Sequence, residues 1–363
     1  MNRKKRIAII GTNGLPATYG GFETLANYIS LHLQSEFNFL IFCSKRENKE
    51  KITSLNGSRL IYFPLKANGW QSVIYDALSI LYSFLFSDVL LILGPTSSGA
   101  LVFLNKIFAK KIIVNYGGVE WKRQMHSKFE QRFAKFNCRV ASRYANYNIA
   151  DNLALKEILL NEFDLESCEI IEYGGDHVSC ETINSDYLSK YPFLNEKFYF
   201  SLGRCQSDNN QHLLLESFKD LPNSFLVAVS NWDHNTYGKL LRDKYSNYSN
   251  IIMLDPIYNQ KEIDVLRSNC YVYIHSHSQC GTAPSLVEAM NLDNAIISFD
   301  VATNRVTTNN KAFYFNDKKS LISILENTSI NDIDKNRKDM TEISKGSYTW
   351  NRISNLYSNL LRN

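Results

Sequence analysis

Residues 275–290, HSHSQCGTAPSLVEAM, collect two histidines, a cysteine and one carboxylate in a short stretch. His275 and His277 lie two residues apart at the end of an apolar run, so they share one face of an expected strand. Zinc would need two further ligands, and only Cys280 is near. A nucleophilic Cys280 would need a partnered base, which the sequence does not reveal. We therefore expect no metal site, and polar side chains at a strand end are the simpler interpretation.

The rest of this stretch, GTAPSLVEAM, has the pattern of a loop that enters a helix. Thr282 is a candidate N-cap, and Pro284 suits the first helical turn. The start of a helix presents free N–H groups and a positive dipole end to an anion. Glu288 lies one turn beyond Ser285 on the same face and can accept hydrogen bonds from a pair of hydroxyls. This layout suits a phosphate beside a sugar ring, although Glu288 as a solvated helix residue stays an alternative.

Short apolar runs alternate with helical patterns along the chain, which is typical of parallel sheets covered by helices on both faces. The expected strands of the first half are residues 6–11, 37–43, 89–93, 110–116 and 147–151. Those of the second half are residues 198–203, 224–230, 250–255, 270–277 and 294–300. The expected helices include residues 22–33, 73–87, a long segment ending near 147, one starting near 153, and residues 210–221 and 260–269.

Composition indicates two packed domains in the 363 residues. We expect domains at residues 1–175 and 198–347, a linker at 176–197, and a final helix at 348–363. A net charge of +4 is too small to indicate a nucleic-acid partner. The seven cysteines are scattered without a C-x-x-C pair, which favours a reducing, cytoplasmic setting. The first apolar run is too short for a signal peptide, and Asp76 and Asp88 interrupt the most apolar segment, so we expect no membrane span.

The loop after the first expected strand, GTNGLPATYGG, lacks the G-x-G-x-x-G pattern of nicotinamide enzymes. Gly20 and Gly21 stand at the start of the next helix. There the absence of a Cβ would let a ligand approach free backbone N–H groups. A plain strand-to-helix turn is the alternative.

Several stretches, in this order, resemble retaining glycosyltransferases of family 4 with the GT-B fold, and within them a subgroup of bacterial rhamnosyltransferases. They are IGTNGLPATYGGFETLA (10–26), VNYGGVEWKR (114–123), YNIADNLALKEIL (147–159), IEYGGD (171–176), SLGRCQSDNNQHLLLESF (201–218), GTAPSLVEAM (281–290) and YTWNRISNLYSNLL (348–361). The resemblance implies two Rossmann-like α/β domains that face each other across a cleft, with the final helix returning to the first domain.

The resemblance also implies a set of residues for the nucleotide-sugar donor. Glu288 matches the glutamate at the ribose, Arg204 the arginine at the diphosphate, and Gly20 and Gly21 the glycine pair facing the same phosphates. The full expected set is Gly20, Gly21, Arg204, Asn209, Thr282, Ala283, Ser285 and Glu288. No metal and no cofactor are expected, because the nucleotide sugar is a substrate and these donors replace the metal.

Three positions depart from the family pattern. A glutamate of many relatives is Cys280 here, a lysine after the diphosphate arginine is Asn209, and a His or Asp after the fifth strand is Gly117. Glu120 is the candidate catalytic substitute, with a structural pairing to Lys122 or Arg123 as the alternative. The departing phosphate can itself take the acceptor proton, so a side-chain base is not required.

The segment between Trp121 and Ala150 holds seven basic residues and one acid. A basic stripe at helical spacing consists of Lys128, Arg132, Lys135, Arg139 and Arg143. A neighbouring stripe consists of Phe129, Phe133, Phe136, Val140, Tyr144 and Tyr147. We expect the aromatic stripe to pack on the sheet, and the basic stripe to be a solvated face or a contact for anionic lipid.

These observations together predict a cytoplasmic glycosyltransferase, peripheral on the inner face of the cell membrane. It would transfer L-rhamnose from dTDP-rhamnose, with retention, to a saccharide linked to a lipid pyrophosphate, in O-antigen or capsule assembly. The donor follows from the subgroup resemblance. A nucleotide-sugar epimerase of the same fold and a catalytically inactive partner subunit are the alternatives.

Overall fold

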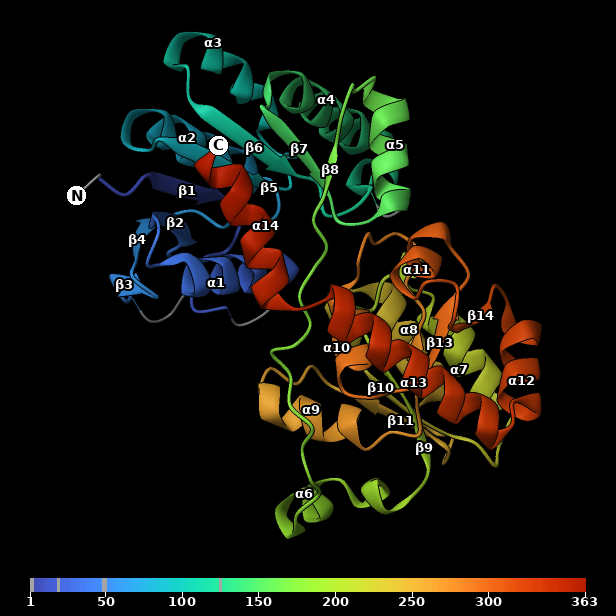
Figure 1. The fold of residues 1–363 in the computed structure, drawn as a ribbon. Coiled ribbons are helices and arrows are strands. Elements are labelled where there is room, and N and C mark those ends of the chain that lie inside the picture. Colours follow the sequence, from blue (N-terminus) through green and yellow to red (C-terminus); the bar gives the residue numbers. More distant parts are fainter. Residues whose placement is uncertain (1–2, 18–19, 48–50, 124–125) are drawn as a thin grey trace. The chain divides into compact units, whose positions relative to one another are not determined.

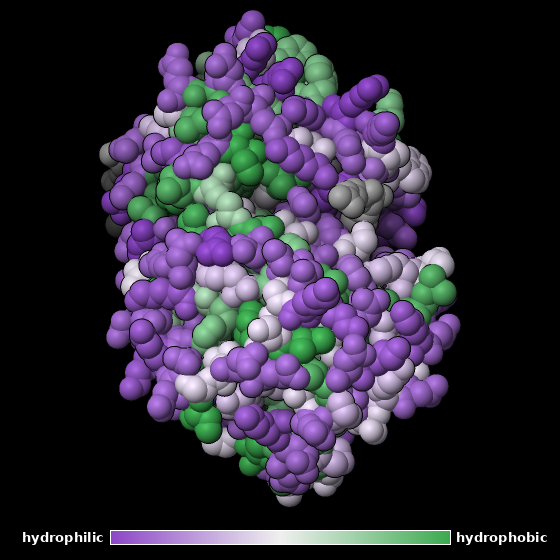
Figure 2. Space-filling model, turned by 90° about the vertical axis from the view of Figure 1, so that its right-hand side faces the viewer, coloured by the Kyte–Doolittle hydropathy of each residue, from purple (hydrophilic) through white to green (hydrophobic). Residues whose placement is uncertain are grey.

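The structure is a computed structural model that describes residues 3–17, 20–47, 51–123 and 126–363. The chain divides into two compact units, each built on its own sheet (Figure 1). The first unit comprises residues 1–173 together with 350–363, and the second comprises residues 174–349. In Figure 2, hydrophilic side chains cover most of the surface in view, and groups of hydrophobic ones lie between them.

The first unit contains an eight-stranded sheet in the order β3-β4-β2-β1-β5-β6-β7-β8, parallel except for the β3–β4 pair. The four central strands are buried along nearly their whole length, as expected for strands with helices on both faces. The strands are β1 (Arg6–Ile10), β2 (Asn38–Ser44), β3 (Ser54–Leu55), β4 (Ser58–Phe63), β5 (Val89–Leu93), β6 (Lys111–Asn115), β7 (Tyr147–Ala150) and β8 (Glu169–Ile170).

Helices cover both faces of this sheet. A core cluster joins one face to a layer made by α2 (Gln71–Phe86), the 3-10 helix η1 (Gly99–Leu104), α3 (Asn105–Phe108), α4 (Lys128–Tyr144) and α5 (Leu153–Phe163). The short η2 (Glu120–Lys122) precedes α4. Elsewhere α1 (Gly21–Leu33) packs against α14 (Trp350–Arg362), so the first and last helices of the chain lie side by side (Figure 1).

The second unit contains a six-stranded parallel sheet in the order β11-β10-β9-β12-β13-β14. Its strands are β9 (Phe198–Leu202), β10 (Phe225–Val229), β11 (Ile251–Leu254), β12 (Val272–His275), β13 (Ile296–Phe299) and β14 (Phe313–Phe315). Its longer helices are α7 (Gln211–Lys219), α8 (Thr236–Tyr245), α9 (Gln260–Ser268), α10 (Pro284–Asn291), α12 (Lys318–Asn327) and α13 (Ile330–Ser347). The shorter ones are α6 (Ser185–Lys190), η3 (Pro192–Asn195), η4 (Ser207–Asn209), η5 (Trp232–His234) and α11 (Ala302–Thr307).

Residues 176–197, expected as a linker, contain α6 and η3 and are attached to the second unit by hydrogen bonds. The Ser179 N–H donates to Asp264 over 3.2 Å, and the Tyr191 hydroxyl donates to Glu262 over 2.5 Å.

The order of the strands in each sheet has one reversal, where the chain leaves one side of the sheet and continues on the other. In the first unit it lies between β1 and β5, and in the second between β9 and β12. Ligands of open α/β sheets bind at the carboxyl ends of the strands at such a reversal. The loops after β1, β5, β9 and β12 are therefore the places to examine for a site.

Among the residues that the structure describes, no helix combines the length and the apolar character needed to cross a bilayer. The segment 73–93 is instead α2 followed by β5, as expected from its two aspartates.

Candidate functional site

The loops after β9 and β12 are held tightly against each other. A Cβ on Gly203, directly after β9, would lie 2.1 Å from Nε2 of His277, so only glycine permits this approach. The Asn210 side chain donates to the Ser276 carbonyl over 3.0 Å. Both loops are thus fixed at the strand reversal of the second unit.

Arg204 and Asn209, from the expected donor set, lie in the first of these loops and differ in environment. Arg204 is exposed, and its guanidinium forms no ion pair with any described residue. Asn209 is 4% exposed, and its Nδ2 donates to the Arg204 carbonyl over 2.8 Å. The guanidinium is therefore available to an anion, whereas Asn209 shapes the loop that carries it.

The helix α10 begins one residue later than the candidate cap Thr282 suggests. Its N-cap is Ala283, which has no side chain able to accept a hydrogen bond, and Pro284 opens the helix as expected. The expectation of a Thr282 cap is wrong; Thr282 and Ala283 are both buried. The backbone N–H of Ser285 is left without a capping side chain.

Glu288, one turn into α10, belongs to a buried ionic cluster. One carboxylate oxygen pairs with Arg267 of α9, whose side chain is 1% exposed, and the other lies 3.4 Å from Nε2 of His177. Arg267 also contacts Asp264 over 3.3 Å. Burial raises the pKa of Glu288, but Arg267 and His177 outweigh it and bring that pKa down to about 2. The carboxylate is thus charged at neutral pH, and 13% of the side chain remains exposed.

The sequence did not indicate Arg267 or His177 as partners of Glu288. Arg267 lies in a helical segment without a motif, and His177 directly follows IEYGGD. A Cβ on Gly175 would lie 2.8 Å from the backbone of Val287, which brings residues 175–177 alongside α10. Gly175 of IEYGGD was therefore the feature of the sequence that could have indicated this close packing.

His275 and His277 are buried rather than presented to solvent. Their rings lie 4.5 Å apart, and burial lowers the pKa of His275 to about 3, so its imidazole is neutral. The Cys280 sulfur lies 3.8 Å from Nδ1 of His277. Within the described part of the chain, no group of three or more His, Cys, Asp and Glu side chains is placed to hold a metal ion.

In the first unit, Phe22 of α1 packs over the carboxyl ends of β5 and β6. A Cβ on Gly117 would lie 2.5 Å from the Phe22 ring, and one on Gly94 would lie 3.0 Å from it. Gly117 also has a φ of +62°, which residues with side chains rarely adopt. The His or Asp of relatives therefore does not fit at Gly117 without displacing Phe22.

Gly20 is the N-cap of α1, with a φ of +120°, and Gly21 is the first residue of that helix. A Cβ on Gly20 would lie 2.0 Å from Oε2 of Glu23, whose other oxygen accepts from the Asn13 N–H over 2.7 Å. The glycine pair thus stands at the strand reversal of the first unit, where Glu23 attaches α1 to the loop after β1. Thr18 and Tyr19 of the motif lie outside the described residues.

Glu120 lies in η2 and pairs with Arg123 over 2.8 Å. Arg123 is buried, so this pair compensates its charge. The alternative role of Glu120, a structural pairing with a neighbouring cation, therefore has Arg123 as its partner.

For the three phenylalanines of the aromatic stripe, the expectation that they pack on the sheet is wrong. Tyr144 packs partly against the core cluster, and Tyr147 lies beyond α4, in β7. Phe129, Phe133 and Phe136 are exposed, and the buried residues of α4 are Asn137, Cys138, Ala141 and Ser142. The helix lies close to η1, because a Cβ on Gly99 would be 3.1 Å from that of Ala141. Only small side chains fit at that distance, so the phenylalanines face outward.

The basic stripe of α4 divides into two parts. Lys135 pairs with Glu162 of α5 over 2.7 Å, and Arg139 donates weakly to the Glu162 carbonyl. Lys128, Arg132 and Arg143 are exposed and form no ion pair with the described residues.

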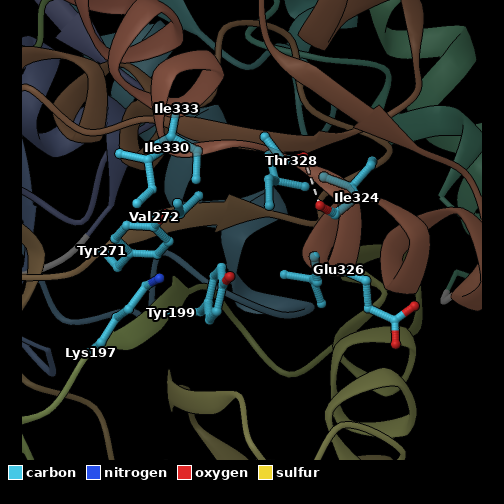
Figure 3. A pocket seen from close by; sticks show the side chains of 11 residues that line it. Lys197, Tyr199, Tyr271, Val272, Ile324, Glu326, Thr328, Ile330 and Ile333 are labelled. Carbon is cyan, nitrogen blue, oxygen red and sulfur yellow. Dashed lines mark hydrogen bonds between the residues drawn. The ribbon is translucent and has the colours of Figure 1, made fainter.

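A pocket of about 230 Å³ in the second unit lies away from these loops (Figure 3). Lys197, Tyr199, Tyr271 and Val272 place it at the amino-terminal ends of β9 and β12. The Lys197 ammonium lies 3.6 Å from the centre of the Tyr271 ring. Because the strand reversal opens at the opposite ends of these strands, we do not assign this pocket to the donor.

Two protein families match the chain, one over most of each unit. Residues 4–176 match the family described as "Domain of unknown function (DUF1972)". Residues 187–346 match "Glycosyl transferases group 1". The glycosyltransferase family model thus matches most of the second unit.

Solved structures resemble the chain over nearly its full length at low identity. Sucrose-phosphate synthase from Thermosynechococcus elongatus is 15% identical, with coverage of 99% of this chain and 98% of its own and a TM-score of 0.81. HepE from Anabaena, solved with UDP and glucose, is 14% identical, with coverage of 99% of both chains and a TM-score of 0.75. A putative UDP-N-acetylglucosamine 2-epimerase from Listeria monocytogenes is 13% identical, covering 99% and 96%, with a TM-score of 0.64. No curated protein sequence matches the chain. The fold, two parallel α/β sheets, is that of the GT-B glycosyltransferases.

Proposed function

We propose that this chain is a retaining glycosyltransferase that transfers L-rhamnose from dTDP-rhamnose to a saccharide linked to a lipid pyrophosphate. The reaction would take place at the inner face of a bacterial membrane, in O-antigen or capsule assembly. The observation that carries the proposal is the group 1 glycosyltransferase domain, with an unpaired, exposed arginine at the strand reversal. Related folds solved with UDP and glucose support a nucleotide sugar as donor.

In this proposal, Arg204 and the uncapped start of α10 bind the donor diphosphate. A guanidinium suits this task because it is always charged and bonds two oxygens at once. Gly20 and Gly21, at the start of α1 in the first unit, offer backbone N–H groups to a phosphate. Glu288, whose side chain is 13% exposed, accepts from the ribose hydroxyls, while Arg267 and His177 hold it charged.

Transfer breaks the bond between the anomeric carbon and the diphosphate oxygen and forms a bond from the acceptor hydroxyl on the same face of the sugar. The acceptor proton passes to the departing phosphate oxygen. The reaction therefore needs no side-chain base at the position that Gly117 occupies. Stabilisation of the developing charge on the diphosphate by Arg204 and the loop amides is then the main contribution to rate.

The proposal is tested by incubating the protein with a panel of nucleotide sugars and a lipid-pyrophosphate-linked saccharide. We expect transfer from dTDP-rhamnose, with the anomeric configuration retained when the product is analysed by NMR. Conversion of a nucleotide sugar without acceptor would instead indicate an epimerase. No turnover and no nucleotide binding by calorimetry would indicate an inactive partner subunit.

A further inference from the structure

The exposed hydrophobic side chains of this protein are concentrated on one helical layer of the first unit. Of the sixteen large ones that are exposed among the described residues, eleven lie on α2, η1, α3 and α4 or at the start of α2, and only three lie in the second unit. Single exposed hydrophobic residues are ordinary, but a contiguous group of this size marks an interaction surface.

On α2 the exposed residues form a regular stripe. Trp70, Ile74, Leu78, Leu81 and Leu85 recur at steps of four or three residues and therefore share one side of the helix. The buried residues Tyr75, Ile80 and Phe84 lie on the opposite side, in the core cluster that faces the sheet. The stripe thus points away from the protein interior.

The stripe continues across α3 to α4. Phe108 of α3 stacks on Phe84 of α2 at 4.8 Å, and Lys106 lies 5.3 Å from the centre of the Tyr144 ring of α4. Between these anchors, Phe103 of η1 and Ile107 of α3 are exposed. On α4 the exposed stripe continues with Phe129, Phe133 and Phe136.

Charge on the same elements is almost entirely positive. The exposed cations Lys128, Arg132 and Arg143 flank the phenylalanines of α4, and Lys106 lies beside Ile107. The one acid of α2, Asp76, is buried, and α4 has a single acid, Glu130, which caps its own helix. A second copy of the chain on this face would bring the two basic flanks together, whereas anionic headgroups would neutralise them.

We propose that this face, the outer side of α2, η1, α3 and α4, inserts its apolar side chains into the headgroup region of an anionic lipid bilayer. Apolar Trp, Phe, Leu and Ile residues beside Lys and Arg are the composition of surface-bound helices. The inference deepens the proposed function, on which it rests for the lipid-linked acceptor. The sequence alone suggested an electrostatic contact through the basic stripe of α4. In the present inference, apolar side chains of several helices insert into the bilayer, and the neighbouring cations bind the anionic headgroups.

Trp70 provides a direct test. It is 74% exposed, whereas Trp121, Trp232 and Trp350 are 4%, 0% and 2% exposed. A change in tryptophan fluorescence on binding therefore comes mainly from Trp70. We expect its emission to shift to the blue, and brominated lipids to quench it, on addition of phosphatidylglycerol vesicles. The shift should be absent in Trp70→Phe, and a parent protein that sediments with the vesicles without any shift would overturn the inference.

A matched pair of triple variants tests the face itself. The first is Trp70→Ser, Leu85→Ser and Ile107→Ser, at side chains 74%, 63% and 76% exposed. The control is Tyr258→Ser, Leu240→Ser and Ile330→Ser in the second unit, at 65%, 63% and 66%. We expect vesicle partitioning to fall at least about tenfold in the first variant and to stay at the parental level in the control. Equal losses in both variants, or none in either, would overturn the inference.

Two further measurements separate the possible results. If the first triple variant turns a dimeric parent into a monomer and the parent does not bind vesicles, a second copy covers the face and the inference is wrong. Donor binding by calorimetry and transfer to a soluble acceptor should be unchanged in that variant. A parent that binds vesicles through Trp70 but neither binds nor transfers any sugar nucleotide would contradict the proposed function and leave this inference standing.

Discussion

Glu288 is a ligand candidate that also supports the fold, and the two roles call for different substitutions. Glu288→Ala leaves Arg267, which is 1% exposed, with Asp264 as its one remaining ion-pair partner among the residues that the structure describes. Removing one partner of a buried ion pair costs about 3 kcal/mol or more, so we expect this variant to lose that much free energy of unfolding in urea titration. Glu288→Gln retains an oxygen acceptor for Arg267 and should lose less.

Donor binding distinguishes the ligand role. We expect Glu288→Gln, once shown to be folded, to bind the donor nucleotide about tenfold more weakly in calorimetry, because a charge-assisted hydrogen bond to the ribose is lost. Unchanged affinity would remove Glu288 from the binding site.

The charge of Glu288 also makes stability depend on pH. Since the pKa of Glu288 is lowered to about 2 in the folded protein, the stability that its charge supplies is present above the unfolded pKa near 4.3 and is lost as the pH falls towards 2.

Arg204 permits a cleaner test because its side chain is exposed and unpaired among the described residues. We expect Arg204→Lys to retain the stability of the parent and to lose most turnover, since an ammonium cannot bond two phosphate oxygens in the same fork. Full activity in this variant would show that backbone amides hold the diphosphate.

Asn209→Lys is not a compensating change for that variant. Asn209 is 4% exposed and donates to the Arg204 carbonyl, so lysine would break this bond and bury a charge.

At the scale of elements, α2 carries a buried acid below its exposed stripe. Burial raises the pKa of Asp76 to about 7, although a hydrogen bond with Ser97 lowers it. An acid with a raised pKa binds more protons in the folded state, so stability falls as the pH rises from about 4 to about 7. We expect Asp76→Asn to remove this fall and to be more stable than the parent at pH 8 by up to about 4 kcal/mol.

The measurement is urea unfolding of parent and variant at pH 5 and pH 8. Asp88→Asn is the control, because Asp88 is partly exposed and accepts from the Arg6 N–H over 2.8 Å. It should not stabilise the protein at either pH. A parent whose stability does not decline between pH 5 and pH 8 would contradict the assignment.

At the scale of the whole chain, the last helix belongs to the unit that the first residues form. Trp350 stacks on Tyr28 of α1 at 4.7 Å, and the Tyr357 hydroxyl accepts from Asn115 of β6 over 2.6 Å. We expect Trp350→Ala to destabilise the first unit by about 3 kcal/mol or more, because a fully buried indole is replaced by a cavity.

Hydrogen exchange followed by mass spectrometry checks this prediction unit by unit. Peptides from β1 and α1 should exchange faster in Trp350→Ala, and those from β9 and α7 should not. Ile330→Ala, at an exposed position of α13, is the control and should change neither set. Faster exchange confined to the second unit would contradict the attachment of α14 to the first.

The sequence alone predicted the parallel α/β class, because each central strand is a continuous apolar run bounded by polar turns. The expected strands correspond to β1, β2, β5, β6 and β7 and to β9 to β13. It did not predict β4, which begins with the polar Ser58 and Arg59, or the short edge strands β3, β8 and β14. Strands of two or three residues are too short to show a period, and they form through pairing with a neighbour.

Among the candidate site residues, sequence motifs located the loops but not the contacts inside them. Arg204, Ala283 and Glu288 follow from motif positions, whereas the pairing of Glu288 with Arg267 joins two helices that no local pattern connects. The conflict at Gly117 likewise depends on Phe22, ninety-five positions earlier in the chain.

The orientation of α4 is the clearest matter that only the tertiary structure decided. Helical periodicity defines a basic stripe and an aromatic stripe, but it does not say which side of the helix faces the sheet. Gly99 and Ala141 bring η1 and α4 so close that only small side chains fit between them. The side of α4 with small side chains therefore faces the interior, because only that side permits such close packing. The phenylalanines that the sequence assigned to the core lie on the surface.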